Sequence, residues 1–84
     1  MKIEIPSPLH SYTKNRSLVE AEGATLAAVF DDLDRRFPGI RFRMVDEQDR
    51  VRPHILVYVD GESRRTLEGP GGREIRIVAA LSGG

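Results

Sequence analysis

The stretch TLAAVFDDLDRRFPGI, residues 25–40, decides the fold. Its apolar side chains recur at steps of three and four residues, which places them on one face of a helix. They are Leu26, Val29, Phe30, Leu33 and Phe37. Thr25 can accept an early backbone N–H as the N-cap, and Pro38-Gly39 favours an end to the helix. The pattern predicts one main amphipathic helix that begins after Thr25 and ends before Pro38.

The polar face of this helix carries acids and arginines four residues apart. We expect the ion pairs Asp31–Arg35 and Asp32–Arg36, each worth about 0.2–0.5 kcal/mol. Asp34 lies on the same face, so the three carboxylates are a candidate catalytic cluster. A general acid needs a desolvated pocket to raise its pKa, and an exposed helix face provides none. We therefore expect no catalytic residue here.

Two short strands are expected before the helix. Residues 1–5 alternate apolar and polar side chains and are followed by Pro6 and Pro8. Residues 19–22 alternate in the same way. The polar, turn-like residues 9–15 lie between them, which predicts a hairpin.

The second half of the chain predicts further strands. Residues 55–59 alternate and end at Asp60-Gly61, a dipeptide typical of a tight hairpin turn, so a partner strand is expected near residues 64–67. A last strand is expected over residues 75–79. Residues 40–44 fit both a strand and one helical turn. The order of elements predicts an α+β roll in which one helix packs across a mixed sheet of four to five strands.

Composition limits the classes of function. The 84 residues predict a single domain, and 13 basic against 13 acidic side chains leave no net charge, so we expect neither nucleic acid nor membrane as a partner. The absence of cysteine excludes a disulfide, a thiol nucleophile and a cysteine-based metal site. No signal peptide or long apolar run is found, so a cytoplasmic location is expected.

The remaining polar motifs do not predict an active site. His10 and His54 lack the spacing of metal ligands, so no metal site is expected. The glycine-rich residues 69–72 precede a strand and contain a proline, which favours a turn over a phosphate-binding loop. The arginine pairs are interleaved with acids, and no aromatic stacking platform is expected beside them, which favours a solvated, salt-bridged surface.

The end of the chain is the remaining candidate for chemistry. Residues 80–84 are expected to form a flexible tail that ends in Gly83-Gly84. A terminal carboxylate is a reactive group that needs no side chain, and glycine lets it enter a narrow cleft without a Cβ clash. We therefore predict Gly84 as the reacting residue, with Leu81, Ser82 and Gly83 threading into a partner. An untethered terminus without function is the alternative.

One face of the predicted sheet is a candidate docking surface. In residues 55–59, Leu56 and Tyr58 point away from the core set formed by the three alternate residues. Val78 of the last strand can join them, and together they could anchor a partner. Packing of the same side chains against residues 40–44 is the alternative.

Several features along the whole chain occur together. They are the first strand, Thr25-Leu26 at the start of the helix, Phe37-Pro38-Gly39-Ile40 after it, RVRPHILVYV at residues 50–59, the turn Asp60-Gly61-Glu62, and the terminal Gly83-Gly84. In this combination the chain resembles the MoaD/ThiS family of ubiquitin-like sulfur carriers. The segment VDGES at residues 59–63 is most similar to carriers that serve cysteine biosynthesis.

The resemblance implies a ubiquitin-like β-grasp fold and a chain that is a substrate, not an enzyme. An E1-like enzyme, using its own ATP and magnesium, would adenylate the Gly84 carboxylate, and a sulfur donor protein would convert it to a thiocarboxylate. The carrier itself would bind no cofactor. The downstream partner would be a cysteine synthase-like enzyme or the large subunit of molybdopterin synthase, or the sulfur would enter a thiamine-type cofactor.

Two other classes of function stay open from the sequence. In a ubiquitin-like modifier, a lysine amine would attack the activated Gly84 to form an isopeptide bond. In a simple interaction module, Gly84 would have no chemical role.

Overall fold

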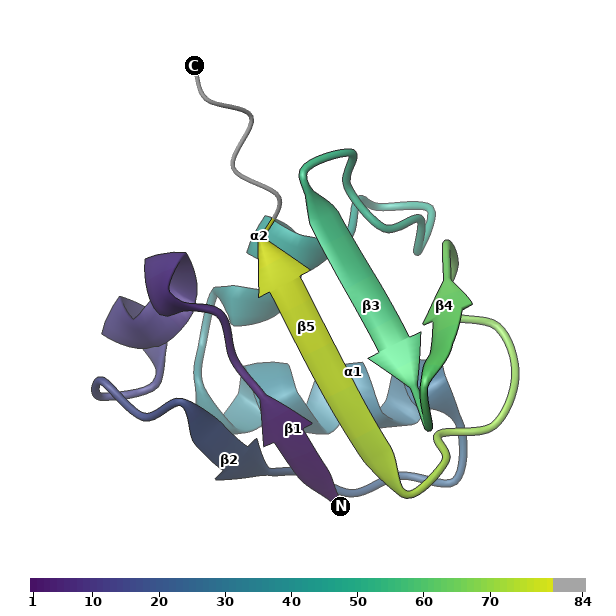
Figure 1. Cartoon of the computed structure of the whole chain (residues 1–84), viewed down its shortest axis with the longest axis horizontal. Coiled ribbons are helices and arrows are strands. Elements are labelled where there is room, and N and C mark those ends of the chain that lie inside the picture. The colour runs from purple at the N-terminus through teal and green to yellow at the C-terminus, as the bar shows by residue number, and fades with distance from the viewer. Residues whose placement is uncertain (80–84) are drawn as a thin grey trace.

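The computed structural model of the chain describes residues 1–79 (Figure 1). Its elements are β1 (Lys2–Glu4), a 3-10 helix (Ser7–Tyr12), β2 (Leu18–Glu20), α1 (Leu26–Arg36), α2 (Ile40–Met44), β3 (Ile55–Val59), β4 (Glu62–Arg64) and β5 (Glu74–Ala79). The fold is the expected α+β roll, with five strands and a second, short helix.

The strands form one mixed sheet in the order β2-β1-β5-β3-β4. β5 is the central strand, and it lies parallel to β1 and antiparallel to β3. The two hairpins, β1–β2 and β3–β4, are antiparallel and flank it. The last strand is therefore held by hydrogen bonds on both sides.

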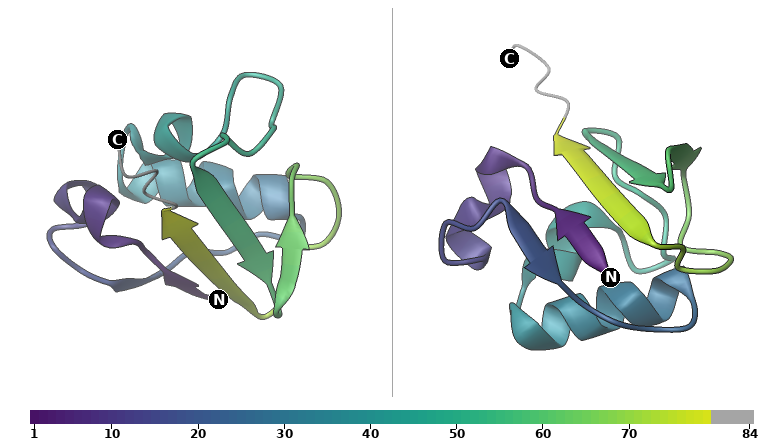
Figure 2. Two further views of the ribbon diagram at one scale, coloured as in Figure 1. Left: turned by 45° about the horizontal axis from the view of Figure 1, so that its top comes forward. Right: turned by 60° about the horizontal axis from the view of Figure 1, so that its bottom comes forward.

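The helices cover one face of the sheet and leave the other face open (Figures 1 and 2). α1 buries the apolar side chains that its spacing predicts, and Phe37 after it is partly buried against the core. The inward side chains of the central strands meet this helix face. They are Ile3, Ile55, Val57, Val59, Ile75 and Ile77.

Local hydrogen bonds define both ends of α1 and the start of α2. Thr25 is the N-cap of α1, because its Oγ1 accepts the Ala28 N–H at 3.1 Å, as expected. After Phe37 the chain passes through Gly39 at φ +94°, which a side chain would strain. One carboxylate oxygen, Asp34 Oδ1, accepts the N–H groups of Gly39 and Arg41, both at 3.1 Å. These bonds turn the chain into α2, so residues 40–44 are helical.

Three predictions from the sequence are corrected. The strand after Asp60-Gly61 spans residues 62–64 instead of 64–67, because the turn contains only these two residues, at φ +50° and +86°. The polar segment after β1 forms a 3-10 helix that buries Leu9. Asp31 does not pair with Arg35, which pairs with Asp32.

Asp31 pairs with an arginine of α2 instead. Asp31 Oδ1 lies 3.1 Å from Arg41 Nε, so it links α1 to α2. The expected pair Asp32–Arg36 is present at 2.9 Å.

Candidate functional site

The predicted docking residues lie together on the open face of the sheet. Leu56 and Val78 are directly opposite each other on β3 and β5, and Tyr58 lies opposite Arg76. All three apolar side chains are partly buried, and their strand neighbours Val57 and Ile77 point into the core. This geometry places them on the side of the sheet away from α2, so the alternative of packing against residues 40–44 is wrong.

Leu56 and Val78 adjoin the end of β5. Ala79, the last described residue, lies opposite Ile55 at the start of β3. The predicted reacting residue Gly84 and the threading residues Leu81, Ser82 and Gly83 lie outside the described residues. The site that the structure describes is thus the surface beside the point where residues 80–84 continue the chain. We call the cross-strand pair Leu56 and Val78, with Tyr58, the open-face patch.

Charged side chains border the open-face patch toward the start of β5. Arg76 Nε donates to Glu4 Oε2 at 2.8 Å across β1 and β5. Beyond this pair the face is hollowed beside the β3–β4 turn, and Tyr58 and Arg76 line the hollow with residues of that turn. There Asp60 Oδ1 accepts the N–H groups of Arg73 and Glu74, both at 2.9 Å, which fixes the turn against the start of β5. The face is therefore apolar near the end of β5 and charged near its start.

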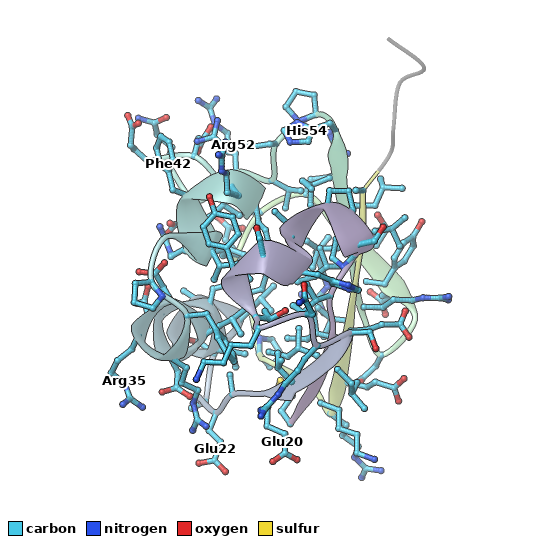
Figure 3. The ribbon with its side chains drawn as sticks, turned by 90° about the vertical axis from the view of Figure 1, so that its left-hand side faces the viewer. Glu20, Glu22, Arg35, Phe42, Arg52 and His54 are labelled. Carbon is cyan, nitrogen blue, oxygen red and sulfur yellow. The ribbon has the colours of Figure 1, made fainter. Side chains whose placement is uncertain are left out.

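α2 presents an aromatic side chain that the sequence analysis did not single out. Phe42 is 59% exposed, whereas Ile40 and Met44 of the same short helix are buried. The Arg52 guanidinium lies 4.5 Å from the centre of its ring, and Arg52 Nε donates to the Phe42 carbonyl at 2.7 Å. Figure 3 shows both side chains at the same end of the molecule as His54. The expectation that no aromatic platform lies beside the arginines is therefore wrong for Arg52. The sequence carried a signal for this, because Phe42 lies opposite Ile40 and Met44 in a helical turn.

The carboxylates of α1 hold the backbone in place. Asp32 Oδ2 accepts the Glu22 N–H at 2.9 Å and also binds Arg36 at 2.9 Å, and its other oxygen binds Arg35. The hydrogen bond from Glu22, followed by that from Arg35, lowers the pKa of Asp32 to about 2. Asp34 caps the turn into α2. A carboxylate with so low a pKa stays ionised at neutral pH and cannot serve as a general acid.

The histidines and the other acids do not come together. His10 Nε2 lies 2.9 Å from the Ile5 carbonyl, and His54 is exposed at the start of β3. Within residues 1–79 no three histidine, aspartate or glutamate side chains are close enough to bind a metal ion. None of the helices in that range has the length and apolar character to cross a membrane.

Comparisons with known proteins agree with the fold and cover the whole chain. The chain is 32% identical to the sulfur carrier protein CysO of Mycobacterium tuberculosis and of Mycobacterium bovis, over 98% of this chain and 96% of the relative. No family model matches the chain.

Solved structures with the same fold include two CysO proteins. CysO in the BexX/CysO complex of Amycolatopsis orientalis aligns with a TM-score of 0.86 at 34% identity, over 99% of this chain and 98% of that chain. Mycobacterium tuberculosis CysO, described as an antigen, aligns with a TM-score of 0.82 at 26% identity, over 95% and 98%.

A third solved structure extends the likeness to archaea. SAMP1 of Haloferax volcanii aligns with a TM-score of 0.71 at 25% identity, over 100% of this chain and 98% of that chain. Full-length similarity in sequence and structure thus agrees with the order of elements, the mixed sheet and the central last strand. The chain belongs to the CysO-type sulfur carriers of the MoaD/ThiS family, with a ubiquitin-like β-grasp fold.

Proposed function

We propose that the chain carries sulfur as a thiocarboxylate on the carboxyl end of Gly84. The single observation that supports this most is the terminal Gly83-Gly84 on a chain that is otherwise a full-length CysO-type domain. Among residues 1–79 the side chains give no competing site, because the acids of α1 bind backbone N–H groups and arginines.

The chemistry requires activation by another protein. A carboxylate is a poor electrophile, so an E1-like enzyme attaches AMP to the Gly84 carboxylate with release of pyrophosphate from ATP. Sulfide sulfur, delivered by a donor protein, then displaces AMP and leaves a thiocarboxylate. The product is ionised near neutral pH and strongly nucleophilic, as thiolates are. ATP and magnesium belong to the activating enzyme, and the carrier is its substrate.

The body of the domain supplies recognition. The open-face patch lies where β5 ends, so a partner that covers Leu56 and Val78 also holds the start of the segment that leads to Gly84. Apolar side chains grouped on one exposed face are typical anchors of a protein interface. A relative of this chain forms the BexX/CysO complex, which supports a protein as the partner.

The proposed destination of the sulfur is cysteine synthesis, in line with the CysO relatives. A pyridoxal-phosphate synthase would present an aminoacrylate, to which the thiocarboxylate sulfur adds. Transfer of the acyl group from sulfur to the neighbouring amine leaves the carrier extended by one cysteine, which a metalloprotease then releases.

Mass spectrometry of the intact chain tests the reaction at Gly84. After incubation with the activating enzyme, ATP and a sulfur donor, the chain should exchange one oxygen for sulfur. A chain extended by one residue beyond Gly84 keeps the same domain and should not react. Modification of the extended chain would refute the proposal, and isopeptide conjugates without a sulfur-exchanged chain would favour the ubiquitin-like modifier.

A second experiment tests the open-face patch as the docking site. The double variant Leu56→Ser, Tyr58→Ser should bind the activating enzyme more weakly by about 2 kcal/mol or more if both are anchors. Arg35→Ser, on exposed α1, is the control and should bind normally. Normal binding by a folded double variant would exclude the patch.

A third experiment separates the destinations. Purified thiocarboxylate is mixed with the co-encoded synthase and activated serine, and the expected product is a chain heavier by one cysteine residue. A stoichiometric complex with a pterin synthase subunit, without this product, would assign the carrier to molybdopterin synthesis instead.

A further inference from the structure

The outer edge of β2 carries backbone groups that point away from the sheet. β2 is the first strand in the sheet order, so β1 lies on one side of it and no strand of residues 1–79 lies on the other. Three contacts join β1 to alternate residues of this segment: Ile3 lies opposite Val19, the Ile5 N–H donates to the Ser17 carbonyl at 2.7 Å, and the Ala21 N–H donates to the Met1 carbonyl at 3.3 Å. In an antiparallel ladder the residues between these direct their N–H and C=O groups outward. They are Leu18 and Glu20.

A carboxylate already occupies the next position along this edge. The N–H of Glu22 follows Leu18 and Glu20 in the same outward series, and it donates to Asp32 Oδ2 at 2.9 Å. One N–H group of the outer row thus already donates to a carboxylate of the chain itself.

A hollow lies beside the same edge. It measures about 340 Å³ and is open to solvent. Its lining residues are Arg16, Leu18, Val19, Glu20, Arg36 and Phe37. Leu18 is 53% exposed, and the partly buried Phe37 follows the end of α1. Two guanidinium groups and one carboxylate line the hollow. Arg36 is already paired with Asp32 at 2.9 Å, so Arg16 is the guanidinium group available to an acidic ligand. Figure 3 faces this side of the molecule, with Glu20 and Glu22 beside β2.

We propose that the outer edge of β2 and this hollow form a second docking surface, which binds an extended segment of a partner protein as an added strand. The outward N–H and C=O groups of Leu18 and Glu20 require an extended backbone, because only a strand offers acceptors and donors at the same spacing. An apolar side chain of the segment covers Leu18, and an acidic side chain lies beside Arg16.

This surface acts independently of the chemistry at Gly84. The edge of β2 is separated from β3 by β1 and β5, so it is distinct from the open-face patch. A chain that lacks Gly84 should therefore bind the segment as well as the full chain does. This comparison separates failure of the docking proposal from failure of the proposed sulfur chemistry.

Titration of the isotope-labelled chain, followed by NMR of its amides, tests the proposal. The probe is a synthetic peptide in which valine and isoleucine are flanked by aspartates, and its matched control has lysines in place of the aspartates. We expect changes in the amide chemical shifts of residues 16–20 and 36–37, and slower hydrogen exchange with solvent at the Leu18 and Glu20 N–H groups. The aspartate peptide should bind at least tenfold more tightly than the lysine control. Absence of binding, shifts on the open-face patch, or equal binding of the lysine peptide would overturn the proposal.

Proline at the edge tests the backbone contact. Glu20→Pro removes an outward N–H and leaves the hydrogen bonds to β1, and proline is tolerated at sheet edges. Glu20→Pro should lower the affinity for the aspartate peptide at least tenfold, whereas Glu20→Ala, which keeps the N–H, should not lower it. If the proline variant fails to fold, Leu18→Asp must give the same loss, because it places a negative charge against the acidic segment. Unchanged binding by a folded variant would refute the added strand.

Self-association is the rival occupant of this edge. Sedimentation of the chain alone measures it, and we expect a monomer at the concentrations of the titration. A dimer that Glu20→Pro abolishes would assign the edge to a second copy of the chain and overturn the proposal.

Discussion

Ile77 and Val78 are neighbours on β5, but their side chains lie on opposite faces of the sheet. Ile77 is 2% exposed and packs in the core, opposite Val57 on β3. Val78 is partly exposed and lies opposite Leu56 in the open-face patch. Replacing each by alanine therefore separates what holds the domain together from what the proposed partner touches.

The two substitutions should differ several-fold in their effect on stability. A buried isoleucine replaced by alanine costs about 2–5 kcal/mol, because the core loses apolar burial and keeps a cavity. For a domain of this size each kcal/mol lowers the melting temperature by roughly 4–8 °C, so Ile77→Ala should lower it by at least about 8 °C. Val78→Ala removes a partly exposed cross-strand contact, which is worth about 0.2–1 kcal/mol.

The functional effects should be reversed. Melting is measured by circular dichroism, and affinity for the activating enzyme is measured at a temperature at which both variants are folded. Val78→Ala should weaken binding by about 1 kcal/mol or more, a factor of roughly five, if Val78 is an anchor. Ile77→Ala should bind as the parent chain does. An equal fall in melting temperature for both variants, or a binding defect confined to Ile77→Ala, would refute the assignment of the two faces.

Three further substitutions probe other parts of the molecule. The low pKa of Asp32, about 2, means that its hydrogen bond to the Glu22 N–H stabilises the fold above pH 4 and that this contribution is lost as pH falls from about 4 to about 2. Asp32→Asn should therefore flatten the dependence of stability on pH in that range, and an unchanged acid unfolding curve would contradict this. Gly23→Ala should destabilise by about 1–3 kcal/mol in urea unfolding, because its Cβ would lie 2.6 Å from the Val29 nitrogen, whereas a gain in stability would show that the backbone yields. Gly83→Val should slow adenylation in a pyrophosphate-release assay without changing the melting temperature, since a branched side chain obstructs a narrow cleft; an unchanged rate would argue against threading.

Elements governed by local interactions were predictable from the sequence. α1 begins after the expected cap, Thr25, and β3 spans residues 55–59, because side-chain periodicity and turn residues act over a few positions. α2 was not predictable, since the bonds from Gly39 and Arg41 to Asp34 depend on how the chain folds back after α1. The placement of β4 failed for a similar reason.

Leu67 explains that failure. It is the last residue of the expected strand, and it is buried. Its N–H donates at 3.0 Å to the carbonyl of Asp49, which lies in a loop that is distant in the sequence. The backbone partner of Leu67 is therefore a loop and not β3. The sequence carries no local signal for such a contact.

The candidate surfaces also combine features that local sequence determines with features that depend on contacts between distant residues. Alternation in β3 was enough to place Leu56 and Tyr58 on one face, because side chains in a strand alternate by geometry. The direct pairing of Leu56 with Val78 required the register of β3 against β5. The edge of β2 required the strand order of the whole sheet, which no short stretch of sequence determines.

The position of β5 limits where the proposed chemistry can occur. β5 pairs with β1 on one side and with β3 on the other, and the pairing with β3 continues to Ala79. Five residues connect Ala79 to Gly84, and a chain of that length spans at most about 17 Å. A partner that holds Val78 in the open-face patch must therefore place its nucleotide and sulfur sites within roughly that distance of its contact with the patch. β1 pairs only with Glu74–Arg76, so the end of β5 that leads to this segment is held by β3. In the proposed function, docking and reaction are thus assigned to different residues, and the short segment between them limits their separation on the partner.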